Sequence, residues 1–445
     1  MGAPETHPYF RLVMPMLRLP ASDAEFDTAL RLAERGVGGF CIFGGDTATL
    51  PGLIGRLQAA APHRLLIASD LERGAGQQIA GLSIHPPPAA LGPDAAEIAG
   101  ARTAVEARRM GITMAFAPVC DVGSESLNPI IQARAFLEPA MSAPRFVVGA
   151  RAQGLRTCAK HFPGHGATHV DSHSGLPRVD APLSIWAERD LPPFAAAIAA
   201  GVDAVMTAHL AAPALTGDEN LPATLSHRVM TGLLRDEMGF RGLTVTDALL
   251  MEGVRGGRTE GEAAALALAA GCDVQLCPED VEGVLAAVVD AGTDVSLERM
   301  MAASVPLRDP LEKAAAHSLR TRGEFPLAQG DHPLRIWSLA GKGAEMAVNA
   351  GLAYEERDFD GKLVSEGAGC GLAQPTIAIL RPDCAWGGDM VLPDAVRAAA
   401  GEAHTVLLFG PSILLEDLHP EAVLVAPGQD PMTLRAAAEC AFGRG

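Results

Sequence analysis

The sequence predicts an α/β protein made of a (β/α)8 TIM-like barrel and a small C-terminal α/β domain. Short β-rich apolar runs alternate with amphipathic helical stretches from the N-terminus to about residue 295, which is typical of parallel βα units. Eight such units can be counted, and eight strands form a TIM-like barrel. The length of 445 residues accommodates a barrel of roughly 250 residues or more together with a smaller domain.

The predicted strands of the barrel are eight apolar runs, at residues 10–16, 38–43, 65–70, 113–121, 155–161, 204–209, 243–247 and 273–277. The helices between them have recognisable start and stop signals. A helix over 21–35 ends before Gly36, and one over 260–270 ends at Gly271, because glycine readily ends a helix. Ser226 is expected to cap a helix that runs to Met238.

The domain boundary is expected near residue 325, with the barrel over 1–325 and the second domain over 326–445. After a break in the pattern at about 296–333, strands are predicted at 335–339, 376–380, 405–409 and 422–425. This rhythm indicates a small α/β domain, flavodoxin-like or reduced. It contains no GxGxxG or phosphate loop, so a structural or dimerising role is expected, in a monomer or homodimer.

Composition and charge narrow the classes of function. Hydrophobic residues make up 48% and charged residues 20%, as in a globular protein with a sizeable core. The net charge of −18 argues against nucleic acid and membrane partners, which need basic surfaces. The sequence has no signal-peptide pattern and no long apolar run, and its eight scattered cysteines resemble buried thiols more than metal ligands. A cytoplasmic protein without metal or cofactor is predicted.

Polar side chains recur where the predicted strands end, namely at Asp70, Asp121, His161, His209 and Asp247. Barrel enzymes keep their active sites at this end of the strands. Considered alone, each residue has a simpler interpretation. Asp247, for example, could cap the helical turn that follows it.

The segment from Lys160 to His173 gives the most specific chemical indication. A sharp Pro-Gly turn follows Lys160 and His161, and the loop beyond it carries Asp171 and His173. A carboxylate that accepts a hydrogen bond from one imidazole nitrogen leaves the other nitrogen free for proton transfer. An isolated Asp-x-His pair would be at least as often a structural feature.

This segment resembles the signature of glycoside hydrolase family 3, in its β-N-acetylhexosaminidase branch. The chain has KHFPGHG at 160–166 and, four residues later, DSH at 171–173. The resemblance implies that His173 is the general acid/base and that Asp171 orients it. It also implies that Asp247, in GLTVTDALLMEGV, is the covalent nucleophile of a retaining mechanism.

Further similarity extends over about two thirds of the chain, through FAPVCDV, NPIIQARAF, VMTAHL, PATLS and AAGCDVQLCP. It implies sugar-binding roles for Asp70, Arg134, Lys160 and His161, and support of the same subsite by His209. Two segments depart from the family. The Asp-x-Glu-Gly-Gly turn has Arg73 in place of its first glycine, and the RSFG segment reads Arg-Ala-Phe-Leu at 134–137. Both lie at the substrate end of the site.

The resulting prediction is a retaining exo-β-N-acetylglucosaminidase that acts on a small molecule or oligosaccharide with a terminal β-GlcNAc, with a role in peptidoglycan recycling. Within the family, a phosphorylase is an alternative because a histidine acid/base does not repel phosphate. A β-glucosidase or β-xylosidase is another alternative. Outside it, a metal-dependent barrel hydrolase could use the clustered histidines and Asp247 as ligands. A non-catalytic sugar-binding protein is the remaining class.

Overall fold

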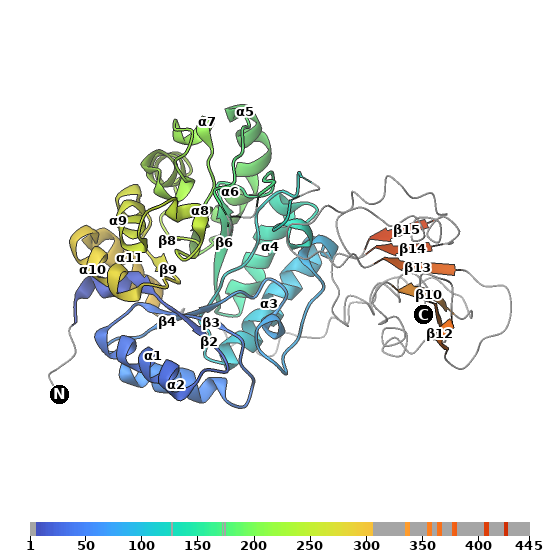
Figure 1. Cartoon of the computed structure of the whole chain (residues 1–445), viewed down its shortest axis with the longest axis horizontal. Coiled ribbons are helices and arrows are strands. Elements are labelled where there is room, and N and C mark those ends of the chain that lie inside the picture. The colour runs from blue at the N-terminus through green and yellow to red at the C-terminus, as the bar shows by residue number, and fades with distance from the viewer. Residues whose placement is uncertain are drawn as a thin grey trace. The chain divides into compact units, whose positions relative to one another are not determined.

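The computed structural model describes residues 6–125, 128–170, 172 and 175–305, together with six strands nearer the C-terminus. The chain divides into two compact units (Figure 1). The first consists of Met1–Ile84 and Leu91–Ala315, and the second of His85–Ala90 and Ala316–Gly445.

The first unit is built on a parallel seven-stranded sheet in which the strands follow one another in chain order. Its strands are β2 (Met16–Arg18), β3 (Gly39–Phe43), β4 (Leu66–Ser69), β5 (Met114–Ala115), β6 (Arg156–Phe162), β7 (Ala204–Thr207) and β8 (Leu243–Val245). Strands that pair in chain order with a helix between them must all point the same way. Their carboxyl ends therefore gather at one end of the sheet.

The two edges of this curled sheet are connected through β9 (Gln275–Leu276). On one side β9 pairs with β1 (Val13–Met14), which directly precedes β2. On the other side, the residue before β9 forms a parallel bridge to the end of β8, Val245 to Val274. Backbone hydrogen bonds accompany both connections, from Cys277 N to Met14 O and from Thr246 N to Val274 O, each of 2.9 Å.

All eight predicted barrel segments contain a strand, but two are interrupted. The first begins with a 3-10 helix, Pro8–Leu12, and then divides into β1 and β2 at Pro15. The segment over 113–121 keeps only β5 and an isolated bridge between Val119 and Lys160. Pro15 and Pro118 lie at these breaks, and a proline has no N–H to donate to a neighbouring strand.

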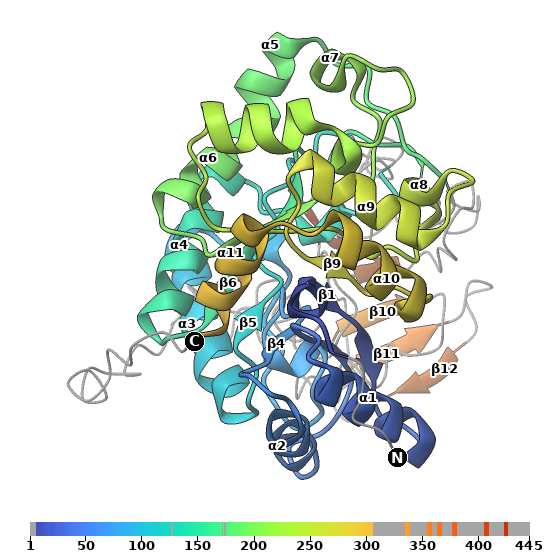
Figure 2. The ribbon, with the colours of Figure 1, turned by 90° about the vertical axis from the view of Figure 1, so that its left-hand side faces the viewer.

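The longer helices lie outside the strands (Figure 2). They are α1 (Asp23–Arg35), α2 (Leu50–Ala60), α3 (Pro93–Arg109), α4 (Pro139–Ala152), α6 (Leu191–Ala199), α9 (Glu260–Ala270), α10 (Val281–Ala291) and α11 (Asp294–Ser304). Two of them confirm the expected end signals, since Gly36 and Gly271 follow α1 and α9 in left-handed conformations, with φ of 89° and 109°.

The helix expected after Ser226 differs from the prediction. It is a π-helix, η7 (Arg228–Glu237), and the residue that precedes it is His227. Ser226 instead ends the short 3-10 helix η6 (Ala223–Leu225), and its carbonyl accepts hydrogen bonds from Val229 and Met230. The prediction of Ser226 as the N-cap was therefore wrong, because Ser226 ends the turn formed by η6 and the N-cap of the next helix, His227, lies one residue later.

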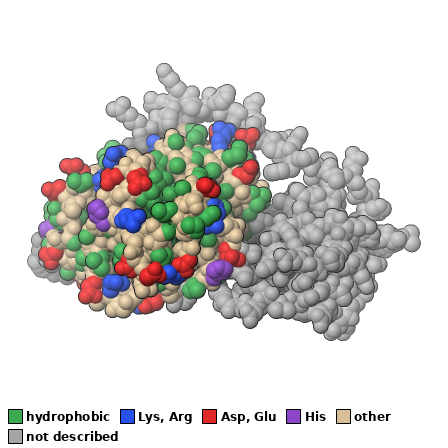
Figure 3. Space-filling view, turned by 90° about the horizontal axis from the view of Figure 1, so that it is seen from above, with side chains coloured by type: hydrophobic (Ala, Val, Ile, Leu, Met, Phe, Trp, Pro, Cys, Tyr) green, Lys and Arg blue, Asp and Glu red, His purple; other side chains and the backbone are tan. Residues whose placement is uncertain are grey.

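A continuous apolar core fills the space around the strands of the first unit. The largest fully buried side chains include Trp186, Phe40, Phe116, Phe162 and Phe194. On the face seen in Figure 3, acidic, basic and apolar side chains are interspersed. Within the described residues, no helix is both long enough and apolar enough to cross a membrane.

The second unit contains a six-stranded sheet in the order β12-β11-β10-β13-β14-β15. The strands are β10 (Leu334–Ser338), β11 (Tyr354–Arg357), β12 (Leu363–Glu366), β13 (Thr376–Leu380), β14 (Thr405–Leu408) and β15 (Ala422–Val425). All neighbours pair in parallel except β12, which is antiparallel to β11. The four strands predicted from the sequence correspond to β10, β13, β14 and β15, whereas β11 and β12 were not predicted.

Candidate active site

A cavity of about 260 Å³ opens at the carboxyl ends of the parallel strands. Asp70 follows β4, Lys160 and His161 lie on β6, and Asp247 follows β8; all four line the cavity. Arg134, from the 3-10 helix η4 (Gln132–Arg134), also lines it. The structure therefore brings together five of the residues that the sequence predicted to form a site. The Lys160–His161 peptide bond is cis.

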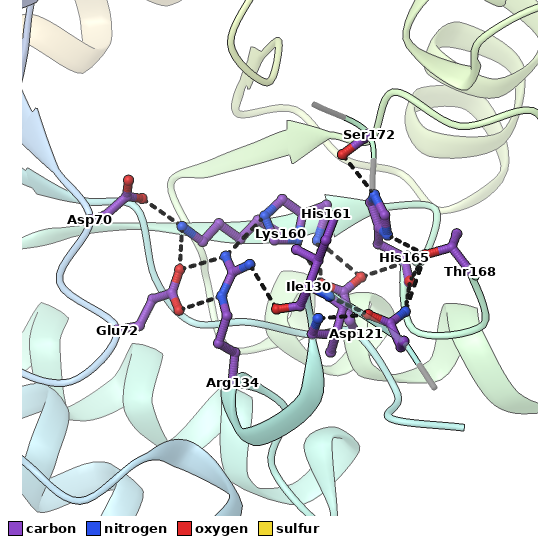
Figure 4. A network of polar contacts seen from close by, with 12 residues as sticks. Asp70, Glu72, Asp121, Ile130, Arg134, Lys160, His161, His165, Thr168 and Ser172 are labelled. Carbon is purple, nitrogen blue, oxygen red and sulfur yellow. Dashed lines mark hydrogen bonds and ion pairs between the residues drawn. The ribbon is translucent and has the colours of Figure 1, made fainter. Parts of the chain in front are cut away.

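Three of the lining residues, Asp70, Lys160 and Arg134, form a cluster of two cations and two carboxylates with Glu72, which does not itself line the cavity (Figure 4). Lys160 Nζ lies 2.6 Å from Asp70 Oδ1 and 2.6 Å from Glu72 Oε1. Arg134 binds the same Glu72 through two nitrogens, Nε at 2.9 Å and Nη2 at 2.8 Å. Such a bidentate pair fixes the plane of the guanidinium. Glu72 thus aligns both cations along the cavity.

The ionisation of this cluster follows from its pairing. Burial by itself would raise the pKa of Glu72, but the charges of Arg134 and Lys160 hold that pKa well below its usual range. Burial would likewise lower the pKa of Lys160, but the carboxylates of Asp70 and Glu72 raise it above the usual value. Glu72, Lys160 and Arg134 are therefore charged near neutral pH. They offer N–H donors and carboxylate acceptors to polar ligands.

His161 is oriented by Asp121, a fully buried carboxylate. Asp121 Oδ2 lies 2.6 Å from His161 Nδ1, and Asp121 also accepts hydrogen bonds from the backbone N–H groups of His161 and His165. Burial would raise the pKa of Asp121, but the interaction with His161 lowers it. The other ring nitrogen of His161 lies 3.4 Å from Arg134 Nη2 and faces the cavity side of the cluster (Figure 4).

Asp247 is a half-buried carboxylate on the cavity wall. Its Oδ1 accepts a hydrogen bond of 2.8 Å from the backbone N–H of Ala248. Burial would raise the pKa of Asp247, but nearby His161 and His209 together with this hydrogen bond lower it. The carboxylate is therefore ionised at neutral pH, as a nucleophile must be.

The loop after β6 is held at Ser172, which also lines the cavity. Ser172 Oγ lies 3.2 Å from His165 Nε2, and its carbonyl accepts a hydrogen bond of 3.0 Å from Gly253 N. His165 is buried, and Thr168 Oγ1 lies 2.8 Å from its Nδ1 (Figure 4). Asp171 and His173, the predicted acid/base pair on either side of Ser172, lie outside the described residues.

Among the predicted site residues that the structure describes, His209 is the one that does not line the cavity. It is fully buried, with Nδ1 2.8 Å from Thr224 Oγ1 and Nε2 3.2 Å from the carbonyl of Ala248. Burial lowers its pKa, so the ring is neutral at neutral pH. Both ring nitrogens are thus occupied by protein groups.

The sequence interpretation assigned no role to Glu72 and none beyond a strand end to Asp121. A signal for Glu72 was available, since it matches the glutamate of the family turn Asp-x-Glu-Gly-Gly. The role of Asp121 as the partner of His161 could be identified only from the folded structure, because the two residues are 40 positions apart in the chain. Of the two departures from the family, Arg73 is half-buried without lining the cavity, and the side chain of Leu137 is 83% exposed.

The geometry suits chemistry on a polyol. The paired cations and carboxylate that line the cavity can hydrogen-bond several hydroxyl groups, and the ionised carboxylate of Asp247 in the same cavity can attack or stabilise a cationic carbon. The nitrogens of His161, His165 and His209 contact protein groups. Among the residues that the structure describes, no three His, Cys, Asp or Glu side chains group as a metal site requires.

Comparisons with known proteins agree with this chemistry. Residues 12–306 match the family model described as glycosyl hydrolase family 3 N terminal domain. Beta-hexosaminidase A of Pseudoalteromonas piscicida is 41% identical over 187 residues, which cover 39% of this chain but only 31% of that protein. The chain thus spans less than a third of the length of this relative.

Two further proteins are similar over most of their own length. A beta-hexosaminidase of Chromobacterium violaceum is 36% identical over 291 residues, covering 61% of this chain and 80% of that one. A solved structure, a glycoside hydrolase family 3 beta-N-acetylglucosaminidase from Paenibacillus sp., superposes with a TM-score of 0.75 at 26% identity. That superposition covers 97% of this chain and 95% of the other.

Proposed function

The chain belongs to glycoside hydrolase family 3, and from this premise we propose that it is a retaining β-N-acetylhexosaminidase that removes terminal β-GlcNAc residues. The curled sheet whose edges are joined through β9 is taken as the (β/α)8 barrel of this enzyme. A function in peptidoglycan recycling and a cytoplasmic location are part of the same proposal. Its support comes from the named activities of the relatives and from the cavity.

The mechanism is a double displacement. His173, as the imidazolium, gives its proton to the glycosidic oxygen while Asp247 attacks the anomeric carbon, so that the leaving alcohol departs and a glycosyl ester forms. Neutral His173 then takes a proton from water, and the hydroxide formed displaces Asp247. Asp171 orients the imidazole in both steps. A histidine suits both roles because its unperturbed pKa is about 6.5.

The observation that carries the proposal is that Asp247 lines the same cavity as Asp70, Lys160 and Arg134, which belong to the cluster held together by Glu72. A sugar whose hydroxyl groups bind this cluster would present its anomeric carbon to an ionised carboxylate. Ser172, the residue between Asp171 and His173, lines the same cavity. This supports the assignment of the acid/base to that loop.

The test is a panel of aryl β-GlcNAc, β-GalNAc, β-glucoside and β-xyloside substrates. We expect hydrolysis of β-GlcNAc with retention of configuration, to be followed by NMR of the first-formed product. Asp247→Ala should abolish turnover. His173→Ala should lose activity mainly on substrates with poor leaving groups, since activated aryl groups depart without protonation. Wild-type activity in Asp247→Ala would overturn the proposal.

Each substrate is tested with and without inorganic phosphate. Water as the acceptor gives the free sugar in both cases, whereas phosphorolysis gives a sugar 1-phosphate only when phosphate is present. We expect the free sugar. A sugar 1-phosphate as the main product would make the enzyme a phosphorylase that uses the same residues.

A further inference from the structure

His209 is buried behind the cavity and makes contact with the backbone next to Asp247. Its Nε2 lies 3.2 Å from the carbonyl oxygen of Ala248. A carbonyl oxygen can only accept a hydrogen bond, so Nε2 must carry the proton. Because burial keeps the ring neutral, Nδ1 is then an acceptor. The hydroxyl of Thr224 has one proton to donate, and it lies closer to Nδ1, at 2.8 Å, than to the Ala208 carbonyl oxygen, at 3.0 Å.

Ala248 is the residue that connects His209 to Asp247. Its carbonyl accepts the hydrogen bond from His209, and its N–H donates to Asp247 Oδ1 at 2.8 Å. The next N–H, of Leu249, donates to Leu276 O at 2.9 Å. The peptide between Ala248 and Leu249 is therefore held at both its oxygen and its nitrogen. Release of the oxygen would allow Ala248 to rotate and its N–H to leave the carboxylate.

Thr207 closes the chain of contacts on the other side of Asp247. Its hydroxyl lies 2.8 Å from Thr224 Oγ1 and accepts a hydrogen bond of 3.3 Å from the backbone N–H of Asp247. Thr207, Thr224 and His209 are all fully buried. A ring of buried hydrogen bonds thus runs from Asp247 through Thr207, Thr224, His209 and Ala248 and returns to Asp247.

We propose that His209 is a positioning residue, held by Thr224 in the neutral form protonated at Nε2, and that through Ala248 it sets the orientation of the Asp247 carboxylate for attack. The inference rests on the proposed role of Asp247 as the nucleophile. The family resemblance implied that His209 supports the sugar subsite in the same way as the sugar-binding residues. The positioning role instead requires no contact between His209 and the sugar. Catalysis depends on such orientation, since a displacement of about 1 Å can cost roughly 100-fold in rate.

Two replacements of His209 separate the hydrogen bond from the space that the ring fills. In His209→Gln the amide nitrogen reaches about as far as Nε2 and can still donate to the Ala248 carbonyl. In His209→Asn the shorter side chain brings its amide only to the position of Nδ1. We expect kcat to fall by about ten- to hundredfold in His209→Asn, and to recover most of this loss in His209→Gln.

The same comparison applies at Thr224. Thr224→Ser keeps the hydroxyl that donates to Nδ1, whereas Thr224→Val removes it and frees the imidazole to move its proton to Nδ1. We expect kcat to fall in Thr224→Val and to be nearly normal in Thr224→Ser. Thr103→Val is the matched control, because the fully buried Thr103 hydroxyl donates to the Ala99 carbonyl within α3, outside the cavity lining.

The pH profile gives a readout that a merely structural role would not change. Among the described residues, the charged and titratable groups that interact with Asp247 are Cys158, Lys160 and His161 on β6, His165 beyond that strand and His209. If Ala248 N–H leaves the carboxylate, the pKa of Asp247 rises, and the acid limb of kcat/KM moves to higher pH. We expect this shift in His209→Asn and Thr224→Val only, with KM nearly unchanged.

The outcomes are distinguishable from a failure of the proposed function. A wild-type enzyme without glycosidase activity, or a fully active Asp247→Ala, would refute the proposed function itself. If the wild type is active and the folded variants His209→Asn and Thr224→Val keep a normal kcat and an unshifted acid limb, only the positioning role is overturned. Equal losses in His209→Gln and His209→Asn, with lowered Tm and unchanged pH profiles, would overturn it in favour of simple packing.

Discussion

At the residue scale, the cavity depends on charges that are buried in pairs. Lys160 is 2% exposed and could not stay charged there without the carboxylates of Asp70 and Glu72. Glu72 has the central role because it is the acid that contacts both Lys160 and Arg134 among the described residues. A sugar that enters this cavity therefore meets donors whose directions are already set, which lowers the cost of binding.

Replacement of Glu72 by Gln tests this pairing. The amide keeps the shape of the side chain but removes the charge that faces two cations, and a broken buried pair typically costs about 3–5 kcal/mol when one partner is lost. We expect a lower Tm and a raised KM for aryl β-GlcNAc, measured by thermal unfolding and steady-state kinetics.

Asp94→Asn is the control for this change, because Asp94 pairs with Arg145 at 3.1 Å but its side chain is 94% exposed. Exposed pairs contribute about 0–1 kcal/mol, so this variant should behave like the wild type. A Glu72→Gln enzyme with unchanged Tm and KM would contradict the role given to Glu72.

At the scale of elements, the site depends on close backbone contacts between loops that follow different strands. The turn after β6 passes so close to the segment after β5 that a Cβ on Gly166 would lie 1.7 Å from the Val122 carbonyl oxygen. Similarly, a Cβ on Gly253 would lie 2.9 Å from the Ser172 carbonyl oxygen and 3.1 Å from that of His209. Glycine is required at such positions because no side chain fits.

Gly166→Ala should therefore force the loop after β6 away from the strand end. We expect a loss of stability of about 1–3 kcal/mol, as for other overpacked sites, together with a larger loss of kcat/KM because the loop carries Asp171 and His173. The measurements are chemical unfolding and turnover of aryl β-GlcNAc.

Gly175→Ala in the same loop is the matched control, since a Cβ there would meet no atom within 4 Å. It should leave both quantities nearly unchanged. Equal effects of the two replacements would show that the close contact at Gly166 does not hold the loop.

At the scale of the whole molecule, stability reflects the ionisable groups that folding buries. Burial and the neighbouring His161 lower the pKa of His165 to about 4. In the unfolded chain the same group has a pKa of about 6.5. Between these two values the unfolded state binds a proton that the folded state does not. The native state is therefore destabilised progressively as the pH falls from about 6.5 to about 4.

His165→Asn should flatten this dependence. The lowered pKa of His165 corresponds to roughly 3 kcal/mol of stability lost across that pH window. We expect the free energy of unfolding of the wild type to decrease more between pH 7 and pH 4 than that of His165→Asn, even though the variant is less stable at pH 7. Denaturant titrations at several pH values measure this.

The exposed His227 provides the comparison for this experiment. His227→Asn should keep the pH dependence of the wild type. A His165→Asn variant whose stability falls with pH as steeply as that of the wild type would contradict the prediction. His209, whose pKa burial also lowers, contributes in the same direction in every variant.

The sequence by itself determined the strands of the parallel sheet and five of the polar residues that line its cavity. Alternating apolar runs mark parallel βα units, and the ends of such strands must meet, so Asp70, Lys160, His161 and Asp247 could be expected at one site. Some strands were predicted too long, because the apolar pattern of a segment does not show where a proline interrupts the hydrogen bonds between strands, as at Pro15. The acid/base assignment to Asp171 and His173 stays a prediction.

Only the tertiary structure decided how these side chains are paired and which way they point. Glu72 joins Arg134 across 62 residues of chain, and His209, although it follows a strand as the others do, turns behind the cavity toward Ala248. A local pattern can place a residue at a strand end, but its partners belong to other strands. The direction of a side chain depends on how those strands pack against one another, and this packing exists only in the folded chain.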